Sequence, residues 1–88
     1  MTKCGLGDFK RYCTRNNISE FKVTIDHYLS GSFSSVRITL VPDMVYFKDK
    51  HGNSLSVHGI TSVCRDGNQF AVDTNYFGNK VTMRISCV

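Results

Sequence analysis

Four cysteines and three histidines are the residues of this 88-residue chain that could do chemistry. Cys64 and His58 lie close enough in sequence for a thiol nucleophile and its base. No third group that would orient the histidine can be named, and the chain has no glycine-rich phosphate loop and no Gly-x-Ser-x-Gly elbow. We therefore expect no catalysis and no small-molecule substrate.

The same side chains lack the spacing of a metal site. A zinc knuckle requires Cys-x-x-Cys, which is absent, and the interval from Cys4 to Cys13 is too wide to replace it. His27, His51 and His58 fall on an expected strand, turn and bend. We expect no metal and no cofactor, and a hydrogen-bonded core position for His27.

An even number of cysteines also suits disulfide bonds, for which the candidates are Cys4, Cys13, Cys64 and Cys87. A bridge such as Cys13–Cys64 would close about 50 residues and contribute roughly 4 kcal/mol in the chain-entropy model. A second bridge, Cys4–Cys87, would join the two ends of the chain. Other pairings, and four free thiols, are equally compatible with the sequence.

Positive charge is concentrated near the N-terminus of a chain whose net charge is +4. Residues 1–17 contain one acidic residue, Asp8, against four basic ones: Lys3, Lys10, Arg11 and Arg15. Lys10, Arg11 and Arg15 are therefore candidates for binding an acidic partner. A solvated basic face is the alternative.

Four further basic residues occupy expected outward strand positions: Lys22, Arg37, Lys80 and Arg84. If the first, second and last strands are neighbours, these side chains form one basic sheet face. Nucleic-acid-binding sheets add exposed aromatics, for which Tyr28, Tyr76 and Phe77 are the candidates. Tyr76 and Phe77 at a loop tip either fold back over the core or form a binding hot spot.

The elements that must position these residues are mostly β-strands. Residues 6–15 fit one short helix, with Asp8 near its start and Asn16-Asn17 at its end, or an irregular basic arm. Beyond residue 20, apolar and polar residues alternate, which predicts about six strands. These are residues 21–29, 35–40, 44–48, 54–64, a strand around Phe70 and Val72, and 80–87.

Turn signals separate these strands. Three Gly-Asn pairs predict tight turns at Gly52-Asn53, Gly67-Asn68 and Gly78-Asn79, the last inside a wider turn over 75–79. Ser30-Gly31-Ser32 predicts another turn. The apolar pattern changes phase at His58-Gly59, which predicts a bulge or a corner where the strand bends from one sheet into another.

We therefore expect an all-β fold of about six antiparallel strands in a small sandwich or barrel. Residues 1–19 would form an N-terminal basic segment and residues 20–88 the β-domain. No segment is long and apolar enough to span a membrane, so no membrane partner is expected. No secretory h-region follows Met1, which predicts either a cytoplasmic protein or the mature form of a secreted one.

Cysteines before the first strand, after the bent strand and at the end of the chain give a layout that resembles the MAX-type fungal effectors. The resemblance is in layout, and no sequence motif carries it. It implies a secreted, disulfide-stapled sandwich of two three-stranded sheets that acts in virulence by binding a host protein. We expect such a protein partner. The alternatives are an intracellular nucleic-acid-binding module of the Sm-like or oligonucleotide-barrel (OB) type, and an inhibitor encoded by a phage or mobile element.

Overall fold

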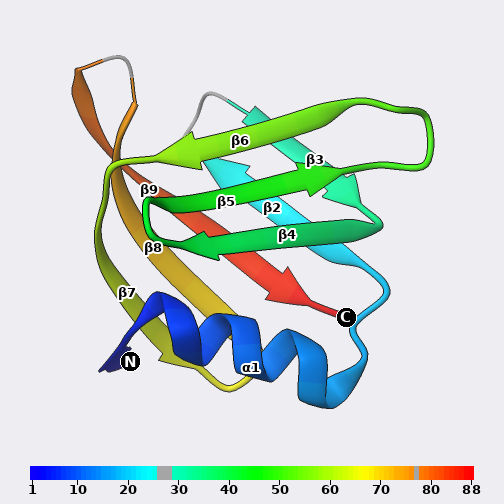
Figure 1. Cartoon of the computed structure of the whole chain (residues 1–88), viewed down its shortest axis with the longest axis horizontal. Helices are drawn as coiled ribbons and strands as arrows, with labels where there is room; N and C mark the ends of the chain where they lie inside the picture. Colours follow the sequence, from blue (N-terminus) through cyan, green and yellow to red (C-terminus); the bar gives the residue numbers. More distant parts are fainter. Residues whose placement is uncertain (26–28, 77) are drawn as a thin grey trace.

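The protein is a two-layered β-sandwich with one helix across its end (Figure 1). The structure is a computed structural model that describes residues 1–25, 29–76 and 78–88, and only the backbone at 29, 30 and 76. One layer is a six-stranded antiparallel sheet in the order β1-β7-β8-β9-β2-β3, and the other is a three-stranded sheet, β4-β5-β6. The all-β fold is confirmed, and it is a sandwich without a closed barrel.

The elements of the larger sheet are β1 (Thr2–Cys4), β2 (Phe21–Ile25), β3 (Leu29–Phe33), β7 (Ile60–Asp66), β8 (Gln69–Tyr76) and β9 (Asn79–Cys87). Those of the smaller sheet are β4 (Ser35–Leu40), β5 (Asp43–Lys48) and β6 (Ser54–His58). Helix α1 (Leu6–Asn16) lies between β1 and β2 in the chain.

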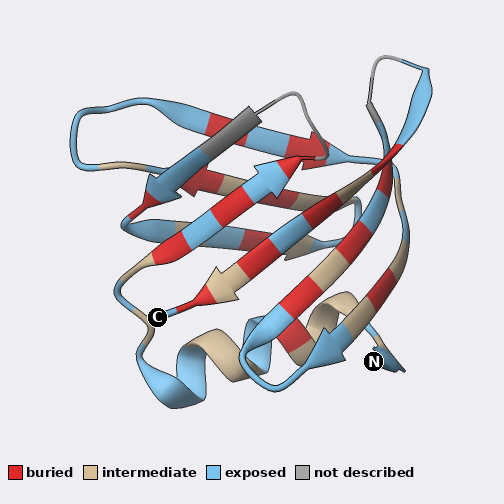
Figure 2. Cartoon of the chain, turned by 180° about the vertical axis from the view of Figure 1, so that it is seen from behind, coloured by how far each residue is buried: buried red, intermediate tan, exposed pale blue. Residues whose placement is uncertain are grey.

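Alternation of apolar and polar residues builds the larger sheet. In β9, the apolar residues of the alternation, Val81, Met83, Ile85 and Cys87, are all buried. Figure 2 shows buried residues alternating with more exposed ones along β2, β8 and β9. Successive strand residues point to opposite faces, so this pattern places one complete face of the sheet in the core.

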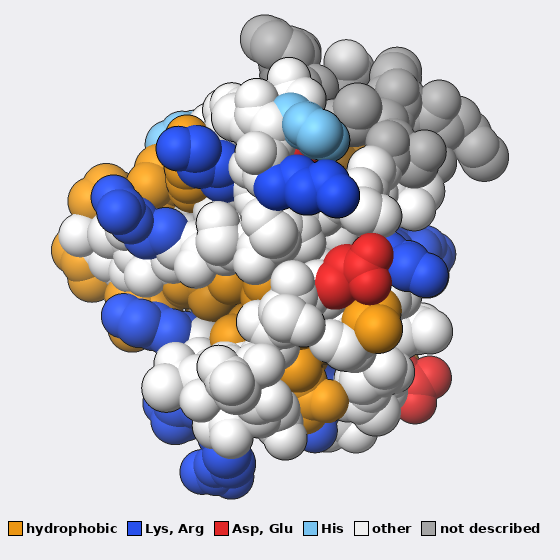
Figure 3. All heavy atoms as spheres, turned by 90° about the vertical axis from the view of Figure 1, so that its right-hand side faces the viewer, with side chains coloured by type: hydrophobic (Ala, Val, Ile, Leu, Met, Phe, Trp, Pro, Cys, Tyr) orange, Lys and Arg blue, Asp and Glu red, His pale blue; other side chains and the backbone are white. Residues whose placement is uncertain are grey.

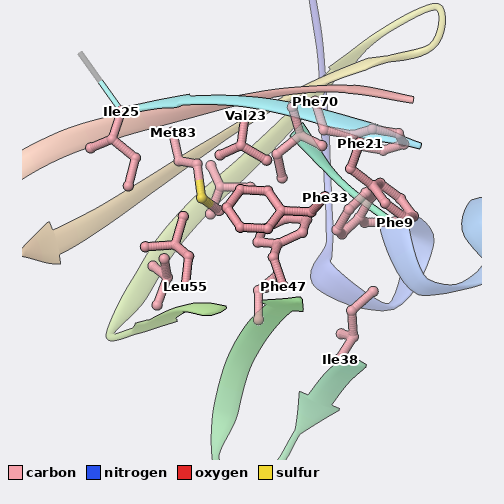
Figure 4. Packing of buried hydrophobic residues seen from close by; sticks show 14 of the residues in the cluster. Phe9, Phe21, Val23, Ile25, Phe33, Ile38, Phe47, Leu55, Phe70 and Met83 are labelled. Atoms are coloured by element: carbon pink, nitrogen blue, oxygen red, sulfur yellow. The ribbon is translucent and has the colours of Figure 1, made fainter. Parts of the chain in front are cut away.

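Aromatic rings join the two layers (Figure 4). Phe47 of β5 is fully buried, and its ring centroid lies 5.9 Å from that of Phe21 in β2 and 5.5 Å from that of Phe33 at the end of β3. At the helical end, Phe9 is fully buried, with its ring 4.8 Å from that of Phe70 in β8. The segment before residue 20 thus shares the core of the strands.

Helix α1 begins and ends where the sequence predicts. The carboxylate of Asp8 accepts a hydrogen bond of 2.8 Å from the Gly5 backbone N–H. Gly5 has no side chain, so only this half of a capping box is made. At the other end Asn17 takes a left-handed conformation, with φ of 50°, and its N–H donates to the Cys13 carbonyl.

The chain passes from one sheet to the other at Gly59, between β6 and β7. Gly59 has a φ of +66°, and the buried hydroxyl of Thr74 donates to the carbonyl of His58. The Asp43 carboxylate accepts the Ile60 N–H at 2.8 Å. The predicted corner at His58-Gly59 is therefore confirmed, and side chains from both sheets hold it.

The glycines of the three Gly-Asn pairs all have positive φ: Gly52, Gly67 and Gly78. The last of these turns is tighter than predicted, because Tyr76 of β8 pairs directly with Asn79 of β9. The prediction of a wider turn over residues 75–79 is therefore wrong.

The predicted strand over 21–29 is also wrong in its extent. It is two strands, because β2 ends at Ile25 and β3 begins at Leu29, with Thr24 opposite Ser30. Ser30-Gly31-Ser32 lies within β3 and is not a turn. His27, for which a hydrogen-bonded core position was predicted, lies outside the residues that the structure describes.

Two further differences lie at strand ends. Strand β1 was not predicted, since three residues are too short to show alternation. Leu40 belongs to the alternating apolar positions of the predicted strand over 35–40, but it is 48% exposed because it ends β4 beyond the packed core.

Candidate binding surface

The four cysteines are free in the structure. Interaction with the Cys87 thiol of β9, together with burial, raises the pKa of Cys13 in α1, and the same interaction lowers the pKa of Cys87. Cys4 and Cys64 belong to neighbouring strands, and burial of Cys4 raises its pKa.

Neither bridge considered from the sequence fits this arrangement. Cys64 pairs with Ala71 and points to the outer face of the larger sheet, so the sheet separates it from Cys13. Strand β1, which carries Cys4, lies three strands away from β9, which carries Cys87. At the usual strand spacing this is roughly 14 Å, far beyond the reach of a disulfide.

The candidate thiol and base are also separated. His58 ends β6 in the smaller sheet, while Cys64 lies within β7 of the larger sheet. Within the described part of the chain, no three His, Cys, Asp or Glu side chains are grouped to hold a metal ion. The geometry offers no catalytic pair among the residues nominated from the sequence.

The four basic strand residues do not share one face. Lys22 and Arg84 lie on the adjacent strands β2 and β9, on the outer face of the larger sheet, and Lys80 lies near the other end of β9. Arg37 lies on β4, in the other layer. The outer face of the larger sheet also carries Asp73, which accepts a hydrogen bond of 2.7 Å from Thr82, so its charge is mixed.

Helix α1 divides its basic residues between two sides. Arg11 forms an ion pair with Asp8, and both line a hollow with Arg15 and Arg65. Lys10 instead lines a groove between α1 and β4, beside Arg37. The helix therefore contributes one cation, Lys10, to the side of the smaller sheet.

Arg65 has a structural role at the foot of the helix. Its guanidinium lies 4.5 Å from the centroid of the Tyr12 ring and 5.7 Å from that of Phe70. Its Nε donates a 2.8 Å hydrogen bond to the Gly67 carbonyl. These contacts connect α1 to the β7–β8 turn through a cation–π interaction.

A hollow with a volume of about 740 Å³ lies on the outer face of the smaller sheet. Arg37, Tyr46 and Ser56 form one cross-strand row there, next to a row of Thr39, Met44 and His58 and a row of Ser35, Lys48 and Ser54. We call these nine residues the tyrosine face. Tyr46 and Met44 are half-buried, whereas Arg37, Lys48 and His58 are exposed.

The tyrosine face contains basic residues but no acidic one among its nine members. The carboxylates at the two ends of β5 accept backbone hydrogen bonds: Asp43 accepts the Ile60 N–H, and Asp49 accepts the N–H groups of His51 and Asn53. Figure 3 shows Lys and Arg side chains gathered at the left of the view, over the layer of the smaller sheet, with hydrophobic side chains between them. The face thus offers positive charge around an apolar centre.

Sequence reasoning missed Tyr46 and Met44 as surface residues. Residues 44–48 are apolar on both faces, which is typical of a strand buried on both sides. Here the second apolar face is the outer surface of a sandwich layer. The sequence signal that could have identified this surface is the pair of outward apolar residues, Met44 and Tyr46, beside Arg37 and Lys48.

Three predicted aromatic residues cannot be placed. The side chain of Tyr76 and all of Phe77 lie outside the described residues, as does Tyr28. Among the described residues, no helix is long and apolar enough to cross a membrane.

Comparisons of the chain with protein-family models, with curated proteins and with solved structures find no match. The resemblance to MAX-type effectors stays a prediction. The site must therefore be interpreted from its own chemistry.

Proposed function

We propose that this chain is a non-catalytic binding domain whose tyrosine face binds an acidic segment of a partner protein. The observation that supports this proposal is the absence of acidic residues from a face that presents Tyr46 and Met44 together with Arg37 and Lys48. Tyr, Met and Arg are enriched in protein interfaces, and a polar rim around an apolar centre is their usual arrangement.

The positive charge of this surface favours a negatively charged partner. Arg37 and Lys48 attract carboxylates, and Lys10 extends the positive region to the edge of the sheet through the groove shared with Arg37. Exposed cations steer association more than they strengthen the final complex. The apolar contacts of Tyr46 and Met44 would supply most of the remaining affinity.

Single-stranded nucleic acid is the second candidate, favoured by the cross-strand neighbours Arg37 and Tyr46. Sheets that bind single strands usually stack two or three bases on aromatic side chains. The tyrosine face has one aromatic among its nine residues, which makes it a poorer platform for bases than for a peptide. The protein partner is therefore preferred.

The test uses fluorescence anisotropy with two sets of probes: acidic peptides that each contain an aromatic residue, and homopolymer RNA and DNA. Replacing Arg37 and Lys48 together by Ala is expected to weaken peptide binding by about tenfold or more. The matched control replaces Lys22 and Arg84 by Ala, which removes the same charge from the larger sheet. We expect the control to bind nearly as the wild type does.

Three results would contradict the proposal. Equal losses in both double variants would show non-specific attraction by net charge. Failure of every acidic peptide to bind would exclude the acidic segment. Tighter binding of homopolymers, lost steeply with added salt and upon Tyr46→Ala, would assign the face to nucleic acid.

A further inference from the structure

We propose that a hollow beside helix α1 binds the phosphate group of a phosphorylated protein segment. This hollow has a volume of about 310 Å³ and is lined by Asp8, Arg11, Tyr12, Arg15, Asn16 and Arg65. We call these six residues the arginine hollow. None of them belongs to the tyrosine face, so the proposal adds a second binding site and does not depend on the first.

Positive charge converges on the arginine hollow from two elements that are distant in the sequence. Arg11 and Arg15 belong to α1, whereas Arg65 lies near the end of β7. Asp8 is the one acidic residue among the six, so three guanidinium groups and one carboxylate give the hollow a net charge of +2. A concave site lined mainly by one sign of charge concentrates ligands of the opposite sign.

Arg65 is held in position before any ligand binds. Its guanidinium lies 4.5 Å from the centroid of the Tyr12 ring, and its Nε donates a 2.8 Å hydrogen bond to the Gly67 carbonyl. Neither Nη group of Arg65 donates to a residue that the structure describes, so both are left for a ligand. A guanidinium that is already ordered loses less conformational entropy on binding.

The other two guanidinium groups differ in their engagement. Arg11 forms an ion pair with Asp8. Arg15 makes no hydrogen bond or ion pair with any residue in the described part of the chain. The hollow therefore offers the free donors of Arg15 and Arg65, together with a third cation whose charge is partly balanced.

A phosphate monoester matches these donors better than a carboxylate does. It carries a charge of about −1.5 to −2 near neutral pH and three oxygens that accept hydrogen bonds. The planar fork of arginine binds such oxygens in pairs, and clusters of arginine are a recurring means of recognising phosphorylated segments. A carboxylate brings a single charge, and Asp8 already supplies one within the hollow.

The hollow is a poor site for a nucleotide base. Tyr12 is the one aromatic residue among the six, and the Arg65 guanidinium lies over its ring. The ring also packs against Phe70, with 5.4 Å between the two centroids. A base stacked on the covered face would have to displace Arg65, whereas single-stranded nucleic acid is normally bound on open aromatic faces. These contacts favour a peptide as the carrier of the phosphate.

A neighbouring hollow gives the peptide chain a path. It has a volume of about 490 Å³, shares Asp8 and Arg65 with the arginine hollow, and reaches Thr2 and Cys4 of β1. Strand β1 is an edge strand of the larger sheet, and the outer backbone groups of an edge strand are open to pairing with an extended segment. A segment whose phosphate occupies the arginine hollow can therefore continue alongside β1.

The experiment titrates nitrogen-15-labelled protein with capped peptides of neutral residues, each of which carries one phosphoserine, phosphothreonine or phosphotyrosine. The same peptides without phosphate are the ligand control. We expect the backbone amide signals of residues 11–16 and 65–67 to shift with the phosphorylated peptides and to stay in place with the control.

The pH dependence of binding reports the charge of the ligand. Between about pH 7 and pH 5 a phosphate monoester loses one negative charge, so binding should weaken several-fold. Hydrogen bonds from Gly5 and Arg11 hold the pKa of Asp8 below its usual value, and no histidine lines the hollow. The lining residues therefore keep their charge over this range.

Arg15→Gln tests the hollow without removing any hydrogen bond or ion pair to the described residues. We expect it to weaken binding of the phosphorylated peptides by about tenfold. Arg15→Lys keeps the charge but lacks the planar fork, so it should recover only part of this loss. The matched control, Arg37→Gln, removes the same charge from the tyrosine face and should bind these peptides as the wild type does.

Four results would overturn the proposal. The first is a set of shifts that does not depend on phosphorylation, or no shifts at all, and the second is equal weakening by Arg15→Gln and Arg37→Gln. Inorganic phosphate that binds as tightly as the peptides would assign the hollow to the free ion. An oligothymidylate with a terminal phosphate that binds more tightly than every peptide would assign it to nucleic acid. Because Arg37 belongs to the tyrosine face and Arg15 to the hollow, failure of one proposal is distinguishable from failure of the other.

Discussion

Asp8 shows how one exposed carboxylate determines where helix α1 begins. The Gly5 backbone N–H donates to it and, together with a hydrogen bond from Arg11, lowers the pKa of Asp8. An acidic side chain in the first turn also interacts favourably with the helix dipole. All three interactions require the ionised form, so they depend on pH.

We predict that Asp8→Asn destabilises the protein at neutral pH and that the difference disappears in acid. The folded-state pKa of Asp8 is lower than its unfolded value, so its contribution is fully present above the unfolded pKa. It is lost as the pH falls through the folded pKa. Urea unfolding of wild type and variant across this range measures the difference, and Asp66→Asn, at the exposed last residue of β7, is the control.

At the scale of the elements, the corner at Gly59 allows one continuous segment to serve both sheets. Strand β6 belongs to the smaller sheet and β7 to the larger. The φ of +66° at Gly59 costs little for glycine, whereas a residue with a Cβ is strained there. The corner therefore depends on backbone conformation more than on packing, since no heavy atom lies within 4 Å of a Cβ built at Gly59.

We predict that Gly59→Ala lowers the free energy of unfolding by about 1–2 kcal/mol. The matched control is Gly31→Ala, because Gly31 lies within strand β3 and a Cβ there would meet the Phe33 ring at an ordinary 3.5 Å. Equilibrium unfolding in urea compares the two. Equal losses in both variants would refute the conformational argument.

The same elements show what the sequence alone can predict. Alternation identified β9 and the fold class, the Gly-Asn pairs identified turns, and the phase slip identified the corner at Gly59. Each is a local signal. Partnership between strands is not local, so Arg37 was grouped with Lys22 although they lie on different sheets, and Tyr46 was not identified as a surface residue.

At the scale of the whole molecule, alternate residues of β5 belong to the core and to the proposed binding face. Phe47 points inward to the rings of Phe21 and Phe33, while Met44 and Tyr46 belong to the tyrosine face. Packed sheets lie about 10 Å apart, so a ring that points inward from one sheet fills much of the local space between them. Substitutions of inward residues of β5 should therefore have different effects from substitutions of its outward residues.

We predict that Phe47→Ala costs about 3–5 kcal/mol, the usual range for removing a buried phenylalanine. For a domain of 88 residues the total stability is roughly 4–13 kcal/mol, so this variant loses a large fraction of it. Phe47→Leu retains most of the volume and should remain folded at a smaller cost, which keeps the comparison measurable. Thermal and urea unfolding measure both.

Met44→Ala is the matched change on the other face of the same strand. Met44 is only half-buried, so we expect a loss of stability well below that of Phe47→Leu, together with weaker binding of the acidic peptide. A variant that is destabilised as strongly as Phe47→Leu would show that Met44 belongs to the core. The tyrosine face would then lose half of its apolar centre, and the case for a protein partner would depend on Tyr46 alone.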